Sequence, residues 1–209
     1  MYLPPVFSES DLSLLQQFMR RYSFATLTSH RDDFHASHLP LVLLPERGSK
    51  GTLIGHMARA NPQWRDFDGE CRVLCIFHGP HAYISPSWYQ ERPAVPTWNY
   101  AVVHASGRPR TIEAPEELAK LIDRTVEEFE PALQDPNNDG HSSFEYRAPL
   151  LNQIVGFEIT IEELQGKFKL GQNRSLEDQR GVAEALRKEG AESAGLLELM
   201  NDQERRRRR

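Results

Sequence analysis

The sequence has few cysteines and no long apolar run. Only Cys71 and Cys75 occur among its 209 residues, too few for the disulfide framework of a small secreted domain. Its apolar runs are a few residues long, whereas about 20 residues are needed to cross a bilayer. Residues 1–11 also lack the basic and apolar regions of a signal peptide. We therefore expect a cytoplasmic protein that has no signal peptide and does not enter a membrane.

Positive charge is also scarce. The formal charge is −5, and five of the 25 basic residues form the terminal run at 205–209. The remaining 20 basic residues face 30 acidic ones, a formal charge of −10. Because duplex binding needs clustered cations, direct DNA binding is weakly supported. The length fits one domain over residues 1–204, and mutual repulsion predicts a disordered arginine tail at 205–209.

Hydrophobic periodicity predicts an α+β fold. Apolar residues recur at helical spacing over 9–22 and 115–130, and further helices are expected at 62–67, 176–188 and 193–200. Strands are expected at 24–29, 35–44, 51–56, 71–77, 81–84, 99–106, 110–112 and 154–161, with turns at Gly79-Pro80 and Gly107. Residues 131–143, which contain DPNNDG, are loop-like and could be a surface insertion or a lid. Many short strands before a long helix are typical of an antiparallel barrel.

One cluster of polar residues, GHMARANPQW at 55–64, leaves a strand and enters a short helix. A cation such as Arg59 beside the free N–H groups of a helix N-terminus suits a phosphate. The alternative is that Arg59 is a surface arginine and Asn61 only a helix cap.

A histidine pair in FHGPHAYISPSWY, at 77–89, invites a metal interpretation. However, Gly79-Pro80 separates His78 from His81, and neither a cysteine nor a carboxylate pair completes a coordination set nearby. We therefore expect a structural turn and no metal site, with Cys71 and Cys75 packed as small apolar residues on a strand.

Two later clusters combine aromatic and polar residues. In VPTWNY, Trp98 and Tyr100 should share one strand face, with Asn99 on the other. These residues could enclose a planar heterocycle, or Trp98 could belong to the barrel core. In GKFKLGQNRSLED, at 166–178, lysines alternate with apolar residues and then Gln172 and Asn173 follow. That segment is either a donor-rich site or a solvated turn capped by Ser175.

Known catalytic patterns are missing from the sequence. It contains neither G-x-S-x-G nor a Walker loop, and neither G-x-G-x-x-G nor H-E-x-x-H. A convincing helix-turn-helix is also lacking. No reaction class therefore has motif support.

Taken together, these segments resemble the PaiB family of FMN-binding negative transcriptional regulators, which have a split-barrel fold. The resemblance rests on MYLPPVF, FATLTS, HASHLPL, TLIGHMARANPQW, FHGPHAYISPSWY, VPTWNYAVVHASGRPR and IVGFEITIEELQGKFKLGQNRSLEDQRGV. It covers nearly the whole chain apart from residues 131–143 and the arginine tail. The resemblance implies a homodimer with FMN at or near the subunit interface.

The resemblance also suggests roles for residues. Arg59, with His56 and Asn61, would hold the FMN phosphate, and His38, Leu39 and Pro40 would lie along the isoalloxazine ring. Trp98 and Tyr100 would shield that ring, with Asn99 near its polar edge. Lys169, Gln172 and Asn173 would bond its pyrimidine side or the ribityl chain. These assignments are expectations about this chain.

Three functions stay open at this point. The first is a flavin-binding repressor, and the second is a flavin-dependent oxidoreductase or flavin reductase. The third is a haem-binding or haem-degrading split-barrel protein that uses one of the eight histidines as axial ligand. The histidines titrate in the range needed for proton transfer, but no residue is a clear proton donor, so whether the chain is an enzyme stays open.

Overall fold

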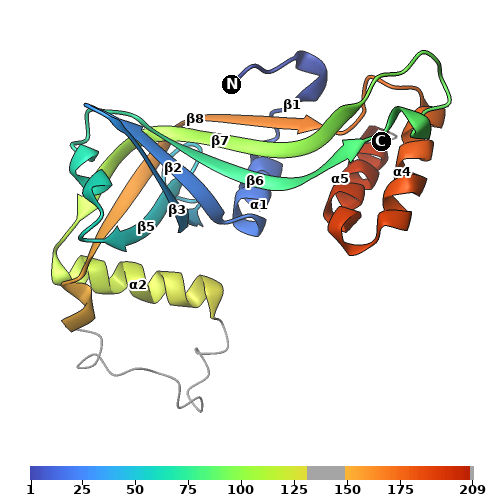
Figure 1. Cartoon of the computed structure of the whole chain (residues 1–209). Helices are drawn as coiled ribbons and strands as arrows, with labels where there is room; N and C mark the ends of the chain where they lie inside the picture. The colour runs from blue at the N-terminus through green and yellow to red at the C-terminus, as the bar shows by residue number, and fades with distance from the viewer. Residues whose placement is uncertain (131–148, 208–209) are drawn as a thin grey trace, which may run out of the picture. The chain divides into compact units, whose positions relative to one another are not determined.

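A computed structural model describes residues 1–130 and 149–207 of the chain. The loop expected at 131–143 lies outside the described residues. An eight-stranded sheet has the order β3-β2-β6-β7-β8-β5-β4, and β1 pairs with β8 (Figure 1). The strands are β1 (Ser8–Glu9), β2 (Phe24–His30), β3 (Phe34–Pro40), β4 (Val42–Leu44), β5 (Thr52–Ala58), β6 (Val73–Ile84), β7 (Thr97–Ile112) and β8 (Ile154–Lys169).

Helices flank this sheet, as the sequence predicts. They are α1 (Leu12–Arg21), α2 (Pro115–Phe129), α4 (Leu176–Glu189) and α5 (Ala191–Arg207), with the 3-10 helices η1 (Pro5–Phe7), η2 (Pro62–Asp66) and η3 (Pro86–Trp88). Strand pairs such as β2–β3, β4–β5 and β5–β8 run antiparallel. The expectation of an antiparallel α+β fold with flanking helices is confirmed. Among the described residues, no helix is long and apolar enough to span a membrane.

The described residues form two compact units that share the long strands. The first unit comprises Met1–Asp11, His78–Val103 and the described part of Gln165–Arg209. The second unit comprises Leu12–Phe77 and the described part of His104–Leu164.

Alternating burial explains the strands of the second unit. In β2, Ala25, Leu27 and Ser29 are buried while the residues between them are more exposed, as expected for a sheet with one covered face. Helix α2 covers part of the sheet through Leu118 and Leu121, which join a core cluster with residues of β4, β5 and β7.

Two expected turns are wrong, because Gly79-Pro80 lies inside β6 and Gly107 inside β7. Strand β2 pairs with β6 only at Leu74–Ile76, so the missing N–H of Pro80 removes no bond from that ladder. A Cβ on Gly107 would lie 1.9 Å from the Thr160 carbonyl oxygen. Glycine is therefore needed there for close approach of two backbones, which sequence alone cannot distinguish from a turn.

The two cysteines differ in their surroundings. Cys75 is fully buried in β6, and burial raises the pKa of its thiol to about 12. Cys71 is partly exposed and precedes the strand, which begins at Val73. The expectation of two cysteines packed on one strand is therefore correct only for Cys75.

Helices α4 and α5 lie side by side in the first unit (Figure 1). Helix α5 continues through Arg207, whereas a disordered tail was expected from residue 205. Arg206 pairs with Glu9 at 3.2 Å, and Arg205 pairs with Asp202. These carboxylates, together with the favourable position of cations at a helix C-terminus, offset the repulsion between the arginines.

Candidate functional site

An exposed group of aromatic rings lies on β6 and β7 in the first unit. The Trp98 side chain is 52% exposed, and its ring centroid lies 5.9 Å from that of His81 and 6.1 Å from that of Tyr83. His81 and Tyr83 are two residues apart on β6, so they share a face. The alternative that Trp98 belongs to the core is wrong. An indole left half exposed beside two other rings offers a stacking surface for a planar ligand.

Two lysines of β8 lie beside other residues of β7, Tyr100 and Thr97. The Lys167 ammonium lies 5.5 Å from the centroid of Tyr100 and 5.4 Å from that of Tyr2. The Lys169 ammonium donates to the Thr97 hydroxyl oxygen. Burial lowers the pKa of Lys169, while the charge of Tyr100 opposes this shift and that of Lys167 adds to it.

We call this group the aromatic–lysine face. It comprises His81, Tyr83, Trp98, Tyr100, Lys167 and Lys169. Residues next to its members along the chain point the other way, since Asn99, Phe168 and Leu170 are buried. The alternation expected for Trp98, Asn99 and Tyr100 is thereby confirmed. The face combines flat rings with two cations, which suits an aromatic ligand that carries negative charge.

Gln172 and Asn173 do not belong to the aromatic–lysine face, because they lie in the turn after β8. The Gln172 side-chain oxygen accepts from the backbone N–H of Leu170 at 2.7 Å, and its amide nitrogen donates to the Phe168 carbonyl. Both ends of that amide therefore stabilise the turn at Gly171, where φ is +87°. Asn173 is exposed. The predicted roles of both residues stay predictions.

Arg59 belongs to the second unit, where its guanidinium has three internal acceptors. Nη1 donates to Glu113 Oε2 at 2.8 Å, and Nε and Nη2 donate to the carbonyls of Asn152 and Ile154, both at 3.1 Å. Its side chain is 39% exposed. A phosphate at Arg59 would compete with the Glu113 carboxylate for this guanidinium.

The other predicted residues of the second unit lie on β3 and β5 or beside them. His38, Leu39 and Pro40 pair with residues of β2, and the Thr26 hydroxyl lies 3.1 Å from His38 Nδ1. Burial of His56, on β5, lowers the pKa of its imidazole. The structure thus divides the predicted site between the units, with Trp98, Asn99, Tyr100, Lys169, Gln172 and Asn173 in the first unit.

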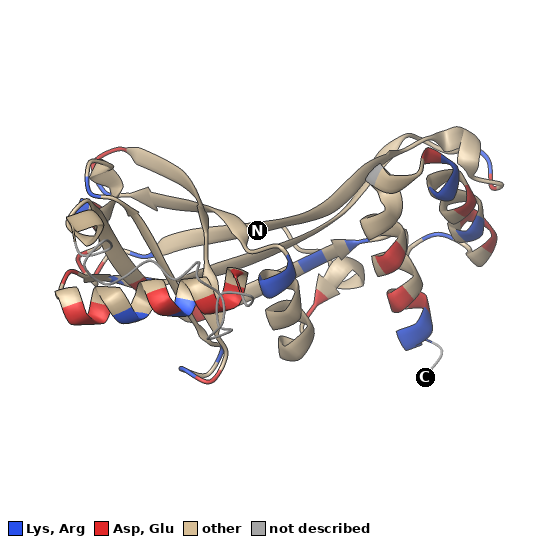
Figure 2. Ribbon diagram, turned by 90° about the horizontal axis from the view of Figure 1, so that it is seen from below, with Lys and Arg blue, Asp and Glu red and all other residues tan. Residues whose placement is uncertain are grey.

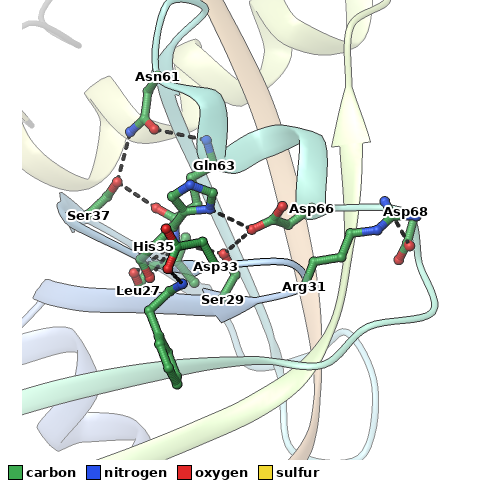
Figure 3. A network of polar contacts seen from close by, with 11 residues as sticks. Leu27, Ser29, Arg31, Asp33, His35, Ser37, Asn61, Gln63, Asp66 and Asp68 are labelled. Atoms are coloured by element: carbon green, nitrogen blue, oxygen red, sulfur yellow. Dashed lines mark hydrogen bonds and ion pairs between the residues drawn. The ribbon is translucent and has the colours of Figure 1, made fainter.

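Asn61 takes part in a network of polar contacts that the sequence analysis missed (Figure 3). Its side-chain oxygen accepts from the backbone N–H of Gln63 at 3.0 Å, which makes it the cap of η2, and its amide donates to Ser37 at 2.8 Å. Gln63 is 1% exposed, accepts from Ser37 and donates to the Leu27 carbonyl. The network therefore anchors η2 on β2 and β3.

Asp66 occupies the other end of the same network. Its Oδ2 accepts from the Ser29 hydroxyl at 2.6 Å and lies 2.9 Å from His35 Nδ1 (Figure 3). Burial raises the pKa of Asp66, but the hydrogen bonds from Ser29 and His35 and the charges of His35 and Arg31 lower it more. The net pKa is below the ordinary value, so the carboxylate stays ionised and keeps η2 in place.

A second contact, which the sequence did not predict, joins α4 to the loop before β7. Asp178 is fully buried, and its Oδ1 accepts from the backbone N–H of Gln90 at 2.7 Å and of Glu91 at 3.1 Å. Its Oδ2 has no hydrogen-bond partner among the described residues. Ser175 caps α4 as expected, yet the helix start is not solvated, because Asp178 anchors that loop.

Solved structures of other proteins share the fold of this chain. The chain has the fold of a FAD- and haem-binding protein from Mycobacterium smegmatis, with a TM-score of 0.60 and 13% identity over 78% of this chain and 73% of that one. A flavocytochrome from Azotobacter vinelandii gives a TM-score of 0.56 and 12% identity over 78% and 69%. The fold is therefore that of the split-barrel flavoproteins.

The chain belongs to the FMN-binding family described as "Putative FMN-binding domain", whose model matches residues 1–163. It is 38% identical to the protease synthase and sporulation protein PAI 2 of Bacillus subtilis. This alignment extends over 204 residues and covers 97% of each chain. It is 32% identical over 233 residues to an uncharacterized protein of Emericella nidulans, covering 92% of this chain and 93% of that one. The expected PaiB-type family and its flavin cofactor are confirmed.

Proposed function

We propose that the protein binds FMN and acts, as a homodimer, as a negative transcriptional regulator of the PaiB type. The observation that carries the FMN proposal is the half-exposed indole of Trp98 beside the rings of His81 and Tyr83. A group of neighbouring exposed rings, unlike a single one, is the kind of surface that a ligand or partner covers.

The residues of the aromatic–lysine face fit the chemistry of FMN. The isoalloxazine is flat and stacks on an exposed indole, and the phosphate and the reduced ring are anionic. Lys167 and Lys169 supply the positive charge on the adjacent strand. Bound FMN would supply a redox-active ring, and a nearby ammonium would favour its reduced, anionic form.

Arg59 is the proposed phosphate anchor, and its ion pair with Glu113 provides a sharp test. We expect Arg59→Ala to weaken FMN binding by about 10- to 100-fold, because charge-assisted hydrogen bonds are lost. Glu113→Gln should strengthen binding, because it frees the guanidinium from a competing carboxylate. Both dissociation constants are measured by FMN fluorescence titration.

The matched control is Arg20→Ala, which removes an exposed arginine from α1. Its FMN affinity should equal that of the wild type. If Arg59→Ala lowers Tm but leaves the FMN dissociation constant unchanged, Arg59 is a structural residue only. If the unsubstituted chain does not bind FMN, the proposed function itself is wrong.

Strand β3 supports the homodimer. It is the last strand of the sheet order and contains no buried residue. Phe34 on β3 is 81% exposed and Phe24 on the paired strand β2 is 67% exposed. An edge strand with exposed aromatic rings is a surface that a second copy can cover. The regulatory role is supported by the relative from Bacillus subtilis, which is named a sporulation protein.

Light scattering after gel filtration tests the assembly, and a mobility-shift assay tests the regulation. We expect a particle with twice the 24.0 kDa mass of the chain. Binding to promoter DNA should weaken steeply as salt rises, because phosphate contacts release counterions. A monomer at micromolar concentration would contradict the homodimer, and absent or salt-insensitive DNA binding would contradict direct repression.

A further inference from the structure

A cleft of about 400 Å³ lies in the second unit, where α2 faces β4, β5, β7 and β8. Its floor consists of four aliphatic side chains, Leu44, Ile54, Ile112 and Leu121, each less than a tenth exposed. Among the residues that the structure describes, none that lines the cleft is aromatic. Such a floor suits an aliphatic chain, because it offers no ring on which a flavin or a nucleobase could stack.

Charged side chains line the rim of this cleft. Arg47, Arg110, Lys120 and Arg124 face three carboxylates, those of Glu46, Glu117 and Glu158, which leaves an excess of one positive charge. The pKa of Glu158 is raised by burial but lowered more by Arg110 and Arg47, which lie 3.0 and 2.8 Å from its oxygens. Glu158 is therefore ionised and already paired.

Lys120 is a rim cation that takes no part in the ion pairs with Glu158. It is exposed and forms no ion pair with the described residues, whereas Arg47 and Arg110 pair with Glu158. Arg124 follows one helical turn later and pairs with Glu127 at 2.8 Å. Lys120 and Arg124 thus lie at the same edge of the cleft, and Arg124 shares its charge with Glu127 while Lys120 does not.

The charges of α2 are sorted between its faces. Figure 2 shows red acidic bands along α2, interrupted by blue ones. Lys120 and Arg124 are the two basic residues of α2, and both line the cleft. Of its acidic residues, Glu117 lines the cleft, whereas Glu116, Asp123, Glu127 and Glu128 do not. A helix that is acidic overall therefore presents both of its cations to the cleft, together with the apolar Leu121 and one carboxylate.

We propose that this cleft binds an aliphatic monocarboxylate of medium chain length. The chain would lie on the four-residue aliphatic floor, and the carboxylate would pair with Lys120 and Arg124. This site is additional to the proposed FMN function and shares no residue with the aromatic–lysine face.

Calorimetric titration of the full chain with decanoate tests this proposal. We expect saturable binding of decanoate with a stoichiometry of one per chain, and weaker binding of decanol and of decyltrimethylammonium. Lys120→Glu should weaken decanoate binding about tenfold, because an attraction is replaced by a repulsion. The matched control Lys188→Glu, on the exposed end of α4, should bind as the wild type does.

Thermal melts and FMN titrations of the same variants separate the outcomes. Lys120→Glu should keep the wild-type Tm within a few degrees and the wild-type FMN affinity. The proposal is overturned if decanoate gives no binding up to 1 mM, if Lys120→Glu binds it equally well, or if decyltrimethylammonium binds better. None of these results would alter the FMN proposal, and loss of FMN binding would leave decanoate binding unchanged.

Discussion

Trp98→Ala is expected to weaken FMN binding by about 10- to 100-fold while Tm changes little. Stacking of a planar ring on an aromatic side chain is worth about 1–3 kcal/mol, and each 1.4 kcal/mol is a tenfold change in affinity. The Tm should be nearly unaffected, because the indole is already 52% exposed in the unliganded chain. FMN fluorescence titration and a thermal melt without FMN measure the two effects.

Two further variants make this test specific to stacking. Trp98→Phe keeps a flat ring and should recover most of the affinity. Val95→Ala removes a side chain that is 66% exposed in the loop before β7, and it should bind FMN normally. If Trp98→Ala binds FMN as tightly as the wild type, the isoalloxazine does not stack on this face.

Asp178→Ala is expected to lower the free energy of unfolding by about 2–4 kcal/mol. The substitution removes a buried carboxylate that accepts two backbone N–H bonds, from Gln90 and Glu91, and hydrogen bonds to charged groups contribute about 1.5–3 kcal/mol each. For a chain of this length the corresponding fall in Tm is about 5–15 °C. Thermal and urea unfolding measure it.

Neighbouring substitutions show whether the buried contact is responsible. Glu177→Ala, at an exposed position in the first turn of the same helix, should cost less than about 1 kcal/mol through the helix dipole alone. Asp178→Asn keeps one acceptor oxygen and should fall between the two. Equal stability of Asp178→Ala and Glu177→Ala would show that Asp178 does not anchor the loop.

Local patterns predicted most of the secondary structure. The helical spacing of apolar residues located α2 to within one residue of its observed bounds, and alternation placed Trp98 and Tyr100 on one face of β7. Such patterns depend on neighbours a few residues apart, which the sequence contains in full. Gly107 was misread as a turn because its role depends on the Thr160 carbonyl, 53 residues further along the chain.

The candidate site was predictable only in part. The residue types of a ring-and-cation site are visible in VPTWNY and GKFKLG, and the alternation of β7 predicts that Trp98 and Tyr100 share a face, while the roles of these residues toward FMN stay predictions. His81 and Tyr83 were not assigned to the site, because the turn expected at Gly79-Pro80 separates their short strand from the rest of β6. The signal that could have found them is the alternation of His81 and Tyr83 on one side of a continuous strand.

By itself the sequence determined the fold family, most of the elements and the alternation that leaves aromatic rings exposed on β7. Only the tertiary structure decided the partners of the polar groups. Glu113 reaches Arg59 from 54 residues away, and the loop at Gln90 reaches Asp178 from 88 residues away. The residue type fixes the charge and size of a side chain. The atoms that surround it depend on how distant segments pack against it.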